Sequence, residues 1–160
     1  MKKKTISFEL SVYETLGALN EQDRDLMHMA IEARKDAYAP YSNFMVGAAV
    51  LLANGKTVIG SNQENASYPS GLCAERVAVF QAGAKYPGVT IKSIAITAMS
   101  KTHLVEKPAA PCGNCRQAIS EYEFKQKSPI ELLLMAEKGE IIKCQSLADI
   151  LPLGFNSSYL

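Results

Sequence analysis

Three cysteines and one glutamate have the types and spacing of a metal site that could carry out hydrolysis. Cys73 precedes Glu75 by two residues, and Cys112 and Cys115 form a Cys-x-x-Cys pair further along the chain. The two sulfurs of such a pair at a helix start converge on one ion, and a third thiolate from a second helix start fills another corner of a zinc tetrahedron. The fourth corner stays open for water, as catalytic zinc requires. The pattern predicts Cys73, Cys112 and Cys115 as ligands of a Zn²⁺ ion.

Glu75 has the position of a proton carrier for this site. It follows the first ligand closely enough to lie near the metal, but it need not bind the metal. A carboxylate there can take a proton from the zinc-bound water and deliver it to a substrate. Three cysteines, a glutamate that is not a ligand and a later Pro-Cys-x-x-Cys are typical of zinc-dependent base deaminases. Glu75 is therefore the predicted catalytic residue.

The remaining cysteine and the two histidines are expected to have no part in this site. Cys144 falls at the end of a predicted strand, and free cysteines are often buried as small apolar side chains. A fourth thiolate would also close the zinc site and leave no position for water. His28 lies on the first predicted helix, as a surface or packing residue. His103 lies in a predicted loop, where we expect it to face solvent.

The predicted elements place both cysteine motifs where a loop leads into a helix. Apolar residues at helical spacing predict a first helix that includes Ala37, with Asn20 as its N-cap and Pro40 blocking its continuation. Asn54-Gly55 predicts a hairpin, hence one antiparallel strand pair. Strands alternating with helices imply an α/β three-layer sandwich, a five-stranded mixed sheet covered by helices. The expected strands span residues 46–52, 57–61, 91–98, 130–135 and 140–144, and the later helices span 73–84, 112–124 and 146–151.

Length and composition favour a single domain over residues 21–160, preceded by an N-terminal extension over residues 1–20. The extension contains a short alternation from Ile6 to Val12 that resembles a strand without an obvious partner. The net charge of +1 gives no reason to expect a nucleic-acid partner. No apolar run approaches the roughly 20 residues of a membrane span, and the N-terminal residues do not resemble a signal peptide. We therefore expect a cytoplasmic protein, whose thiols stay reduced.

Beyond the zinc motifs, the sequence resembles the small homotetrameric cytidine deaminases with three zinc-binding cysteines. The resemblance covers about residues 25–155. It is carried by residues 39–44 (APYSNF), 46–49 (VGAA), 60–66 (GSNQENA), 73–76 (CAER), 111–117 (PCGNCRQ) and 151–155 (LPLGF). It implies hydrolytic deamination of cytidine and 2′-deoxycytidine to uridine and 2′-deoxyuridine with release of ammonia, a reaction of pyrimidine salvage. It also implies one Zn²⁺ per subunit, and a homotetramer whose subunits share active sites.

The resemblance also implies roles for the residues around the metal. Arg76 would offset the negative charge of the thiolates, and the backbone N–H of Ala74 would hold the base carbonyl at position 2. Phe155 would reach a neighbouring subunit's site and stack on the base. The other implied contacts are Asn62 and Glu64 with the ribose 3′-hydroxyl, Phe44 with the nucleoside, and Ala66 and Tyr68 near the 5′-hydroxyl.

Three alternative functions remain open at this stage. Deaminases of free cytosine, of tRNA adenosine and of deoxycytidylate typically carry histidine at the position of Cys73, whereas blasticidin S deaminase also uses three cysteines. A zinc-stabilised binding module without catalysis would give no role to Glu75. A redox pair formed by Cys112 and Cys115 would give no role to Cys73 or Glu75. Ammonia release from a panel of substrates separates these alternatives.

Overall fold

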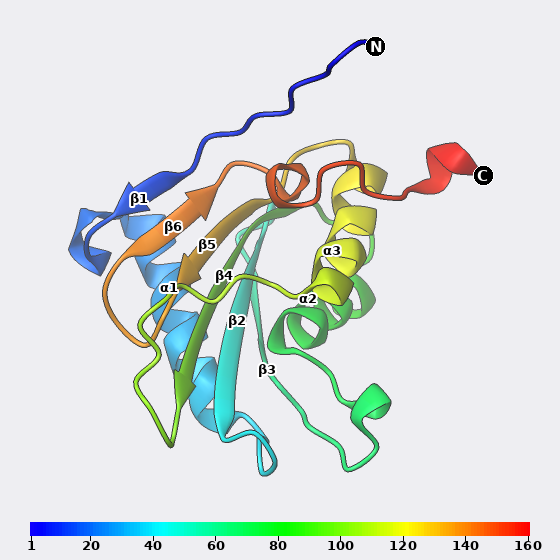
Figure 1. Ribbon diagram of the computed structural model, residues 1–160. Helices are drawn as coiled ribbons and strands as arrows, with labels where there is room; N and C mark the ends of the chain where they lie inside the picture. Colours follow the sequence, from blue (N-terminus) through cyan, green and yellow to red (C-terminus); the bar gives the residue numbers. More distant parts are fainter.

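A six-stranded mixed sheet forms the middle layer of the structure, a computed structural model that describes residues 1–160 (Figure 1). The strand order is β1-β6-β5-β4-β2-β3, and only β4 and β5 pair in parallel. The predicted hairpin at Asn54-Gly55 joins the antiparallel strands β2 and β3, with Gly55 at a φ of 77°. The strands are β1 (Ser11–Tyr13), β2 (Phe44–Leu52), β3 (Thr57–Ser61), β4 (Ile91–Ser100), β5 (Glu131–Met135) and β6 (Ile141–Cys144).

The prediction of five strands was short by one, because β1 lies in the N-terminal region where no partner was evident. Val12 of β1 is opposite Ile142 of β6 in an antiparallel pair. The partner comes from near the other end of the chain, and the pairing depends on backbone hydrogen bonds. A period-2 pattern in the sequence can suggest a strand, but it carries no information about a partner so far away.

Three α-helices cover the two faces of the sheet (Figure 1). Helix α1 (Glu21–Ala33) packs Met27 and Ala30 against one face, where Ala49 of β2 and Leu133 of β5 are buried. Helices α2 (Ala74–Lys85) and α3 (Gly113–Gln126) cover the opposite face. Burial on both sides explains why the sheet strands read as nearly continuous apolar runs. None of the helices has the length and apolar character needed to cross a membrane.

Helix α1 begins as predicted but ends earlier. The Asn20 side chain caps the helix by accepting a hydrogen bond from the Asp23 N–H at 2.8 Å. The helix ends at Ala33 and continues as a short 3-10 turn over Arg34–Asp36, so Ala37 lies outside it. The reason is tertiary: Tyr38 exchanges backbone hydrogen bonds with the segment that follows β3, and this pairing requires extended backbone.

Gly60 allows α2 to lie directly on β3. A Cβ atom at this position would stand 2.6 Å from the Ala78 nitrogen and 2.7 Å from the Ala74 oxygen, both backbone atoms of α2. Backbone cannot move aside as a flexible side chain can, so only glycine permits this approach. Gly60 therefore sets the depth at which the first turn of α2 meets the sheet.

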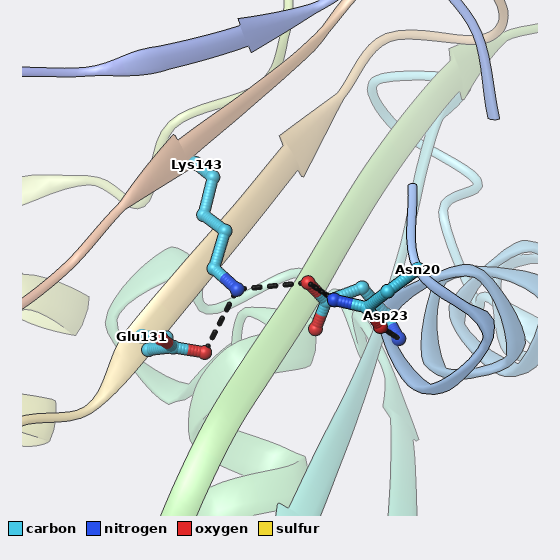
Figure 2. A network of polar contacts seen from close by, with 4 residues as sticks. All are labelled: Asn20, Asp23, Glu131 and Lys143. Carbon is cyan, nitrogen blue, oxygen red and sulfur yellow. Dashed lines mark hydrogen bonds and ion pairs between the residues drawn. The ribbon is translucent and has the colours of Figure 1, made fainter. Parts of the chain in front are cut away.

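A buried ionic network ties β6 to the start of α1 (Figure 2). The Lys143 ammonium group lies 2.8 Å from Asp23 and 3.0 Å from Glu131, and Asn20 donates a further hydrogen bond to Asp23 at 2.9 Å. The Lys143 and Asp23 side chains are 10% and 6% exposed, so both charges are largely removed from water. Each is tolerated there because the other compensates it.

We predict that Lys143→Met lowers the free energy of unfolding by about 3 kcal/mol, because it leaves the Asp23 carboxylate buried without a counter-charge. Adding Asp23→Asn should recover part of this loss. The matched control is Lys35→Met, which breaks an exposed pair with Glu32 and should cost less than about 1 kcal/mol. Urea unfolding measures all three, and equal effects of the two lysine variants would contradict a buried network.

Candidate active site

The N-termini of α2 and α3 converge and bring three sulfur atoms together. Cys73 is the N-cap residue of α2, Cys112 is the N-cap residue of α3, and Cys115 lies in the first turn of α3. Their sulfur atoms all lie within 4.8 Å of one another, and the Cys73 and Cys112 sulfurs are 4.0 Å apart. The predicted cysteines therefore form one cluster, although they come from two separate loops.

The cluster has the dimensions of a tetrahedral thiolate site for zinc. Zinc–sulfur bonds of about 2.3 Å place the sulfurs of a tetrahedron about 3.8 Å apart. The Cys73–Cys112 sulfur separation of 4.0 Å is close to this value, and no two of the three sulfurs are more than 4.8 Å apart. Cys144 is buried outside the cluster, and His28 and His103 are exposed outside it. Three ligands leave one corner of the tetrahedron for a water or substrate atom.

The Cys73 and Cys115 thiols differ in how readily they lose a proton. A hydrogen bond from Cys115 is the main cause that lowers the pKa of Cys73 to about 5, and Arg76 contributes to the same shift. The pKa of Cys115 is raised, mainly through the same hydrogen bond. The Arg76 Nη2 lies 3.9 Å from the Cys73 sulfur, so its positive charge is placed directly beside the thiolate. The charge-balancing role of Arg76 stays a prediction, and this contact is the geometry that the role requires.

Glu75 is a buried carboxyl group in the first turn of α2, with only 4% of its surface exposed. Burial raises its pKa to about 7, and the negative charge of Cys73 adds to the shift. Its Oε2 atom is buried and has no hydrogen-bond partner in the protein. A buried polar atom without a partner is costly, and such atoms concentrate at functional sites.

A cavity of about 590 Å³ opens onto the cysteine cluster, a volume suited to a small molecule. Among the predicted site residues, those that line it are Phe44, Asn62, Glu64, Tyr68, Cys73, Glu75, Arg76 and Cys112. Ala66 and Phe155 do not line the cavity of this single chain. Ala74 is fully buried as the first residue of α2, where backbone N–H groups lack partners within the helix.

Glu64 is held in place by the segment that precedes β2. Its carboxylate accepts hydrogen bonds from the backbone N–H groups of Tyr41 (2.9 Å) and Ser42 (3.2 Å) and from the Ser42 hydroxyl. The Ser42 hydroxyl is the main cause that lowers the pKa of Glu64. Asn43, which follows Ser42 in the chain, adopts a left-handed backbone with a φ of 57°, which asparagine tolerates well. The carboxylate is thus fixed at the cavity wall in its charged form.

The Asn62 side chain is largely occupied by backbone. Its Oδ1 accepts a hydrogen bond from the Val46 N–H at 2.7 Å, and its Nδ2 donates to the Phe44 carbonyl at 3.0 Å. One N–H of the amide remains available for a ligand. Asn62 therefore fixes the first residues of β2 beside the cavity. The prediction for Asn62 named only a ribose contact and did not include this structural role.

Sequence reasoning missed several residues of the site. Asn114 lines the cavity, and its place inside the Pro-Cys-Gly-Asn-Cys motif was the available signal. Ser42 belongs to the Tyr-Ser-Asn-Phe motif, but its contact with Glu64 depends on the fold. Arg116 had no assigned role. Its guanidinium donates hydrogen bonds of 2.8 Å to the carbonyls of Pro111 and Ile150, so it holds the loop before Cys112.

The fold and the site together define a zinc-dependent deaminase. The family model described as the cytidine and deoxycytidylate deaminase zinc-binding region matches residues 20–128. The chain therefore belongs to the cytidine and deoxycytidylate deaminase family, whose members bind zinc through this region.

Within that family, the chain is similar to proteins named cytidine deaminase. One from Halalkalibacterium halodurans is 45% identical over 96 residues, which cover 60% of this chain and 68% of the relative. One from Sporosarcina psychrophila is 39% identical over 130 residues, covering 81% and 88%. A crystal structure of cytidine deaminase from Burkholderia pseudomallei aligns with a TM-score of 0.72 and 40% identity, over 86% of this chain and all of that one. The cytidine deaminase structure from Mycobacterium tuberculosis aligns with a TM-score of 0.64 and 31% identity, over 86% and 99%.

We predict that Cys112→Ser lowers the zinc content of the purified protein well below that of the wild type, because a hydroxyl is a poor replacement for a thiolate ligand. Elemental analysis after gel filtration measures the metal. The matched control is Cys144→Ala, which removes a buried cysteine outside the cluster and should retain zinc. Equal zinc in wild type and Cys112→Ser would contradict the assignment.

Proposed function

We propose that the protein catalyses the hydrolytic deamination of free cytidine and 2′-deoxycytidine, with Cys73, Cys112 and Cys115 holding one zinc ion per subunit. The observation that carries the proposal is the buried Oε2 atom of Glu75. This atom has no hydrogen-bond partner, and Glu75 lines the same cavity as Cys73 and Cys112. The overall reaction adds water to the base and releases ammonia, which leaves uridine or 2′-deoxyuridine. Family membership and the named relatives support this reaction.

Glu75 moves the protons in the proposed mechanism. A bound zinc ion supplies a Lewis acid that makes water nucleophilic at neutral pH. A carboxyl group with a pKa of about 7 can both accept and donate a proton at that pH. Glu75 accepts one proton of the attacking water and donates it to nitrogen 3 of the base, where it remains in the product. Glu75 then accepts the second proton, from the hydroxyl group now on carbon 4, and donates it to the departing amine. The two protons of the water thus end on nitrogen 3 of the uracil ring and on the ammonia product.

Arg76 keeps the cysteine cluster from carrying its full negative charge. Three thiolates on a divalent ion leave a net negative site, which opposes the acidification of water. The Arg76 guanidinium beside Cys73 offsets part of that charge without binding the metal. Arg76 is a positioning and electrostatic residue in this proposal, because it reaches the metal only through Cys73.

In this proposal the substrate is held by residues that line the cavity together with Cys73 and Cys112. Glu64 presents a charged carboxylate that can accept a hydrogen bond from a ribose 3′-hydroxyl, and Asn62 has one amide N–H left for the same group. Phe44 and Tyr68 provide apolar surface for the nucleoside. The Ala74 N–H at the start of α2 would hold the base carbonyl at position 2. Ala66 would approach the 5′-hydroxyl end together with Tyr68.

The assembly and setting follow from the same proposal. Residues 21–160 form the deaminase domain and residues 1–20 extend it. Phe155 is 56% exposed and lies outside the cavity of its own chain, which is the placement expected of a ring offered to a neighbouring subunit. We accordingly propose a homotetramer with shared sites that acts on nucleosides in cytoplasmic pyrimidine salvage.

We predict that Glu75→Gln retains zinc but loses nearly all turnover, a fall in kcat of at least about a thousandfold, because the amide cannot carry a proton. The decrease in ultraviolet absorbance of cytidine measures turnover, and elemental analysis measures zinc. Glu121→Gln changes an exposed glutamate on α3 and should behave as wild type. Turnover of Glu75→Gln at the wild-type rate would exclude the proposed mechanism.

We also predict that the zinc-loaded protein releases ammonia from cytidine and deoxycytidine, and much less from deoxycytidylate, blasticidin S or cytosine. Deoxycytidylate carries its phosphate on the 5′ oxygen, and the residues proposed for the 5′-hydroxyl end, Ala66 and Tyr68, have no positive charge to pair with it. Free cytosine lacks the ribose that Glu64 and Asn62 would bind. Coupled ammonia detection at matched concentrations compares the five compounds. A preference for deoxycytidylate or blasticidin S would refute the assignment of substrate class.

A further inference from the structure

The C-terminal segment is fastened to the first turns of α3 by side chains that follow the last cysteine of the cluster. Arg116 donates a hydrogen bond of 2.8 Å to the Ile150 carbonyl. Gln117 donates one of 2.9 Å from its Nε2 to the Phe155 carbonyl. These two contacts span 34 and 38 residues of sequence, so they are tertiary contacts. The backbone of Phe155 is thus held by the same helix that carries Cys115.

The Phe155 ring is held separately, by a second aromatic ring. The rings of Phe155 and Tyr159 stack with their centroids 5.5 Å apart and an angle of 15° between their planes. The short 3-10 turn Ser157–Tyr159 returns the chain to make this contact, and the Asn156 side chain caps it by accepting from the Ser158 N–H at 2.9 Å. Tyr159 follows the end of the segment that resembles known deaminases, so the family resemblance assigns it no role.

The stack contributes little to the hydrophobic core. Phe155 remains 56% exposed and Tyr159 remains 67% exposed. Two stacked rings cover one face of each other, and more than half of the Phe155 surface remains available for a further contact. A contact between this exposed surface and another flat ring would be a favourable aromatic contact in its own right.

We infer that Gln117 and Tyr159 are positioning residues that hold Phe155 ready to stack on a nucleoside base, with Tyr159 backing the ring on its other face. This inference rests on the proposed function, in which Phe155 enters a neighbouring subunit's cavity. A free phenylalanine near a chain end would lose rotamer and backbone freedom on stacking, and that loss weakens binding. The Gln117 hydrogen bond and the Tyr159 ring restrict Phe155 before the substrate binds. The entropy of ordering Phe155 is therefore lost on folding and does not weaken substrate binding.

Steady-state kinetics on the zinc-loaded full-length protein test the inference. We expect Tyr159→Ala and Gln117→Leu to raise KM for cytidine by about two- to tenfold, the range of an aromatic contact or a hydrogen bond. The kcat and the zinc content should stay at wild-type values, because neither residue contacts the reacting atoms. Tyr159→Phe keeps the ring and should keep the wild-type KM. Ser157→Ala, in the same turn but outside the stack, is the matched control.

A double-mutant cycle distinguishes positioning of Phe155 from a general structural role. Phe155→Ala should itself raise KM, and adding Tyr159→Ala to it should have no further effect, because there is no ring left to hold. An unchanged KM in Tyr159→Ala or in Phe155→Ala would overturn the inference, as would a full additional increase in the double variant. Loss of zinc or of the native assembly in Tyr159→Ala, measured by elemental analysis and gel filtration, would indicate a structural role and overturn it as well.

The inference and the proposed function fail in different ways. If Glu75→Gln abolishes turnover while Tyr159→Ala behaves as wild type, the proposed mechanism stands and the positioning role of Tyr159 is wrong. If Glu75→Gln turns over cytidine normally, the proposed mechanism is wrong whatever the KM of the Tyr159 variants.

Discussion

The site depends on the meeting of two helix N-termini at one place above the sheet. Cys73 and Cys112 are the N-cap residues of α2 and α3, and their sulfurs come within 4.0 Å only because both helices lie on the same face of the sheet. Helix N-termini favour negative charge, so the arrangement suits thiolate ligands, and the pKa of Cys73 is lowered to about 5. Gly60 permits α2 to lie close enough to β3 for this meeting. A shift of either helix would separate the sulfurs.

Burial determines how the polar groups of the site divide their tasks. The Asn62 and Glu64 side chains satisfy much of their hydrogen-bonding capacity with backbone, which fixes the cavity wall. Glu75 is buried with a carboxyl oxygen left unpaired, and its pKa is raised to about 7. Fixed groups can hold a substrate, whereas an unpaired carboxyl group near neutrality can exchange a proton. In the proposed mechanism, the same carboxylic acid chemistry thus serves two purposes in two environments.

The two ends of the chain are attached to this core in different ways. Strand β1 adds to the edge of the sheet by pairing with β6, next to the buried network of Lys143, Asp23 and Glu131. The C-terminal segment is instead held by side chains of α3, among them Arg116, which also holds the loop before Cys112. The metal motif and the C-terminal segment therefore share one rigid support.

The amino-acid sequence by itself determined the chemistry and most of the elements. The spacing of Cys73, Glu75, Cys112 and Cys115 predicted the cluster, and hydrophobic periodicity with turn signals predicted five of the six strands and the three main helices. These features depend on residue type and on neighbours nearby in the chain.

Only the tertiary structure decided the sixth strand, the early end of α1, the contact of Ser42 with Glu64 and the stacking of Tyr159 on Phe155. Most of these features depend on pairing between residues far apart in sequence, and local periodicity carries no information about such partners. Phe155 and Tyr159 are close in sequence, and their stacking depends on the intervening turn that the Asn156 side chain caps, while a tertiary hydrogen bond from Gln117 holds the Phe155 backbone. The physical reason is the same throughout: local patterns specify which elements form, and packing decides which side chains meet.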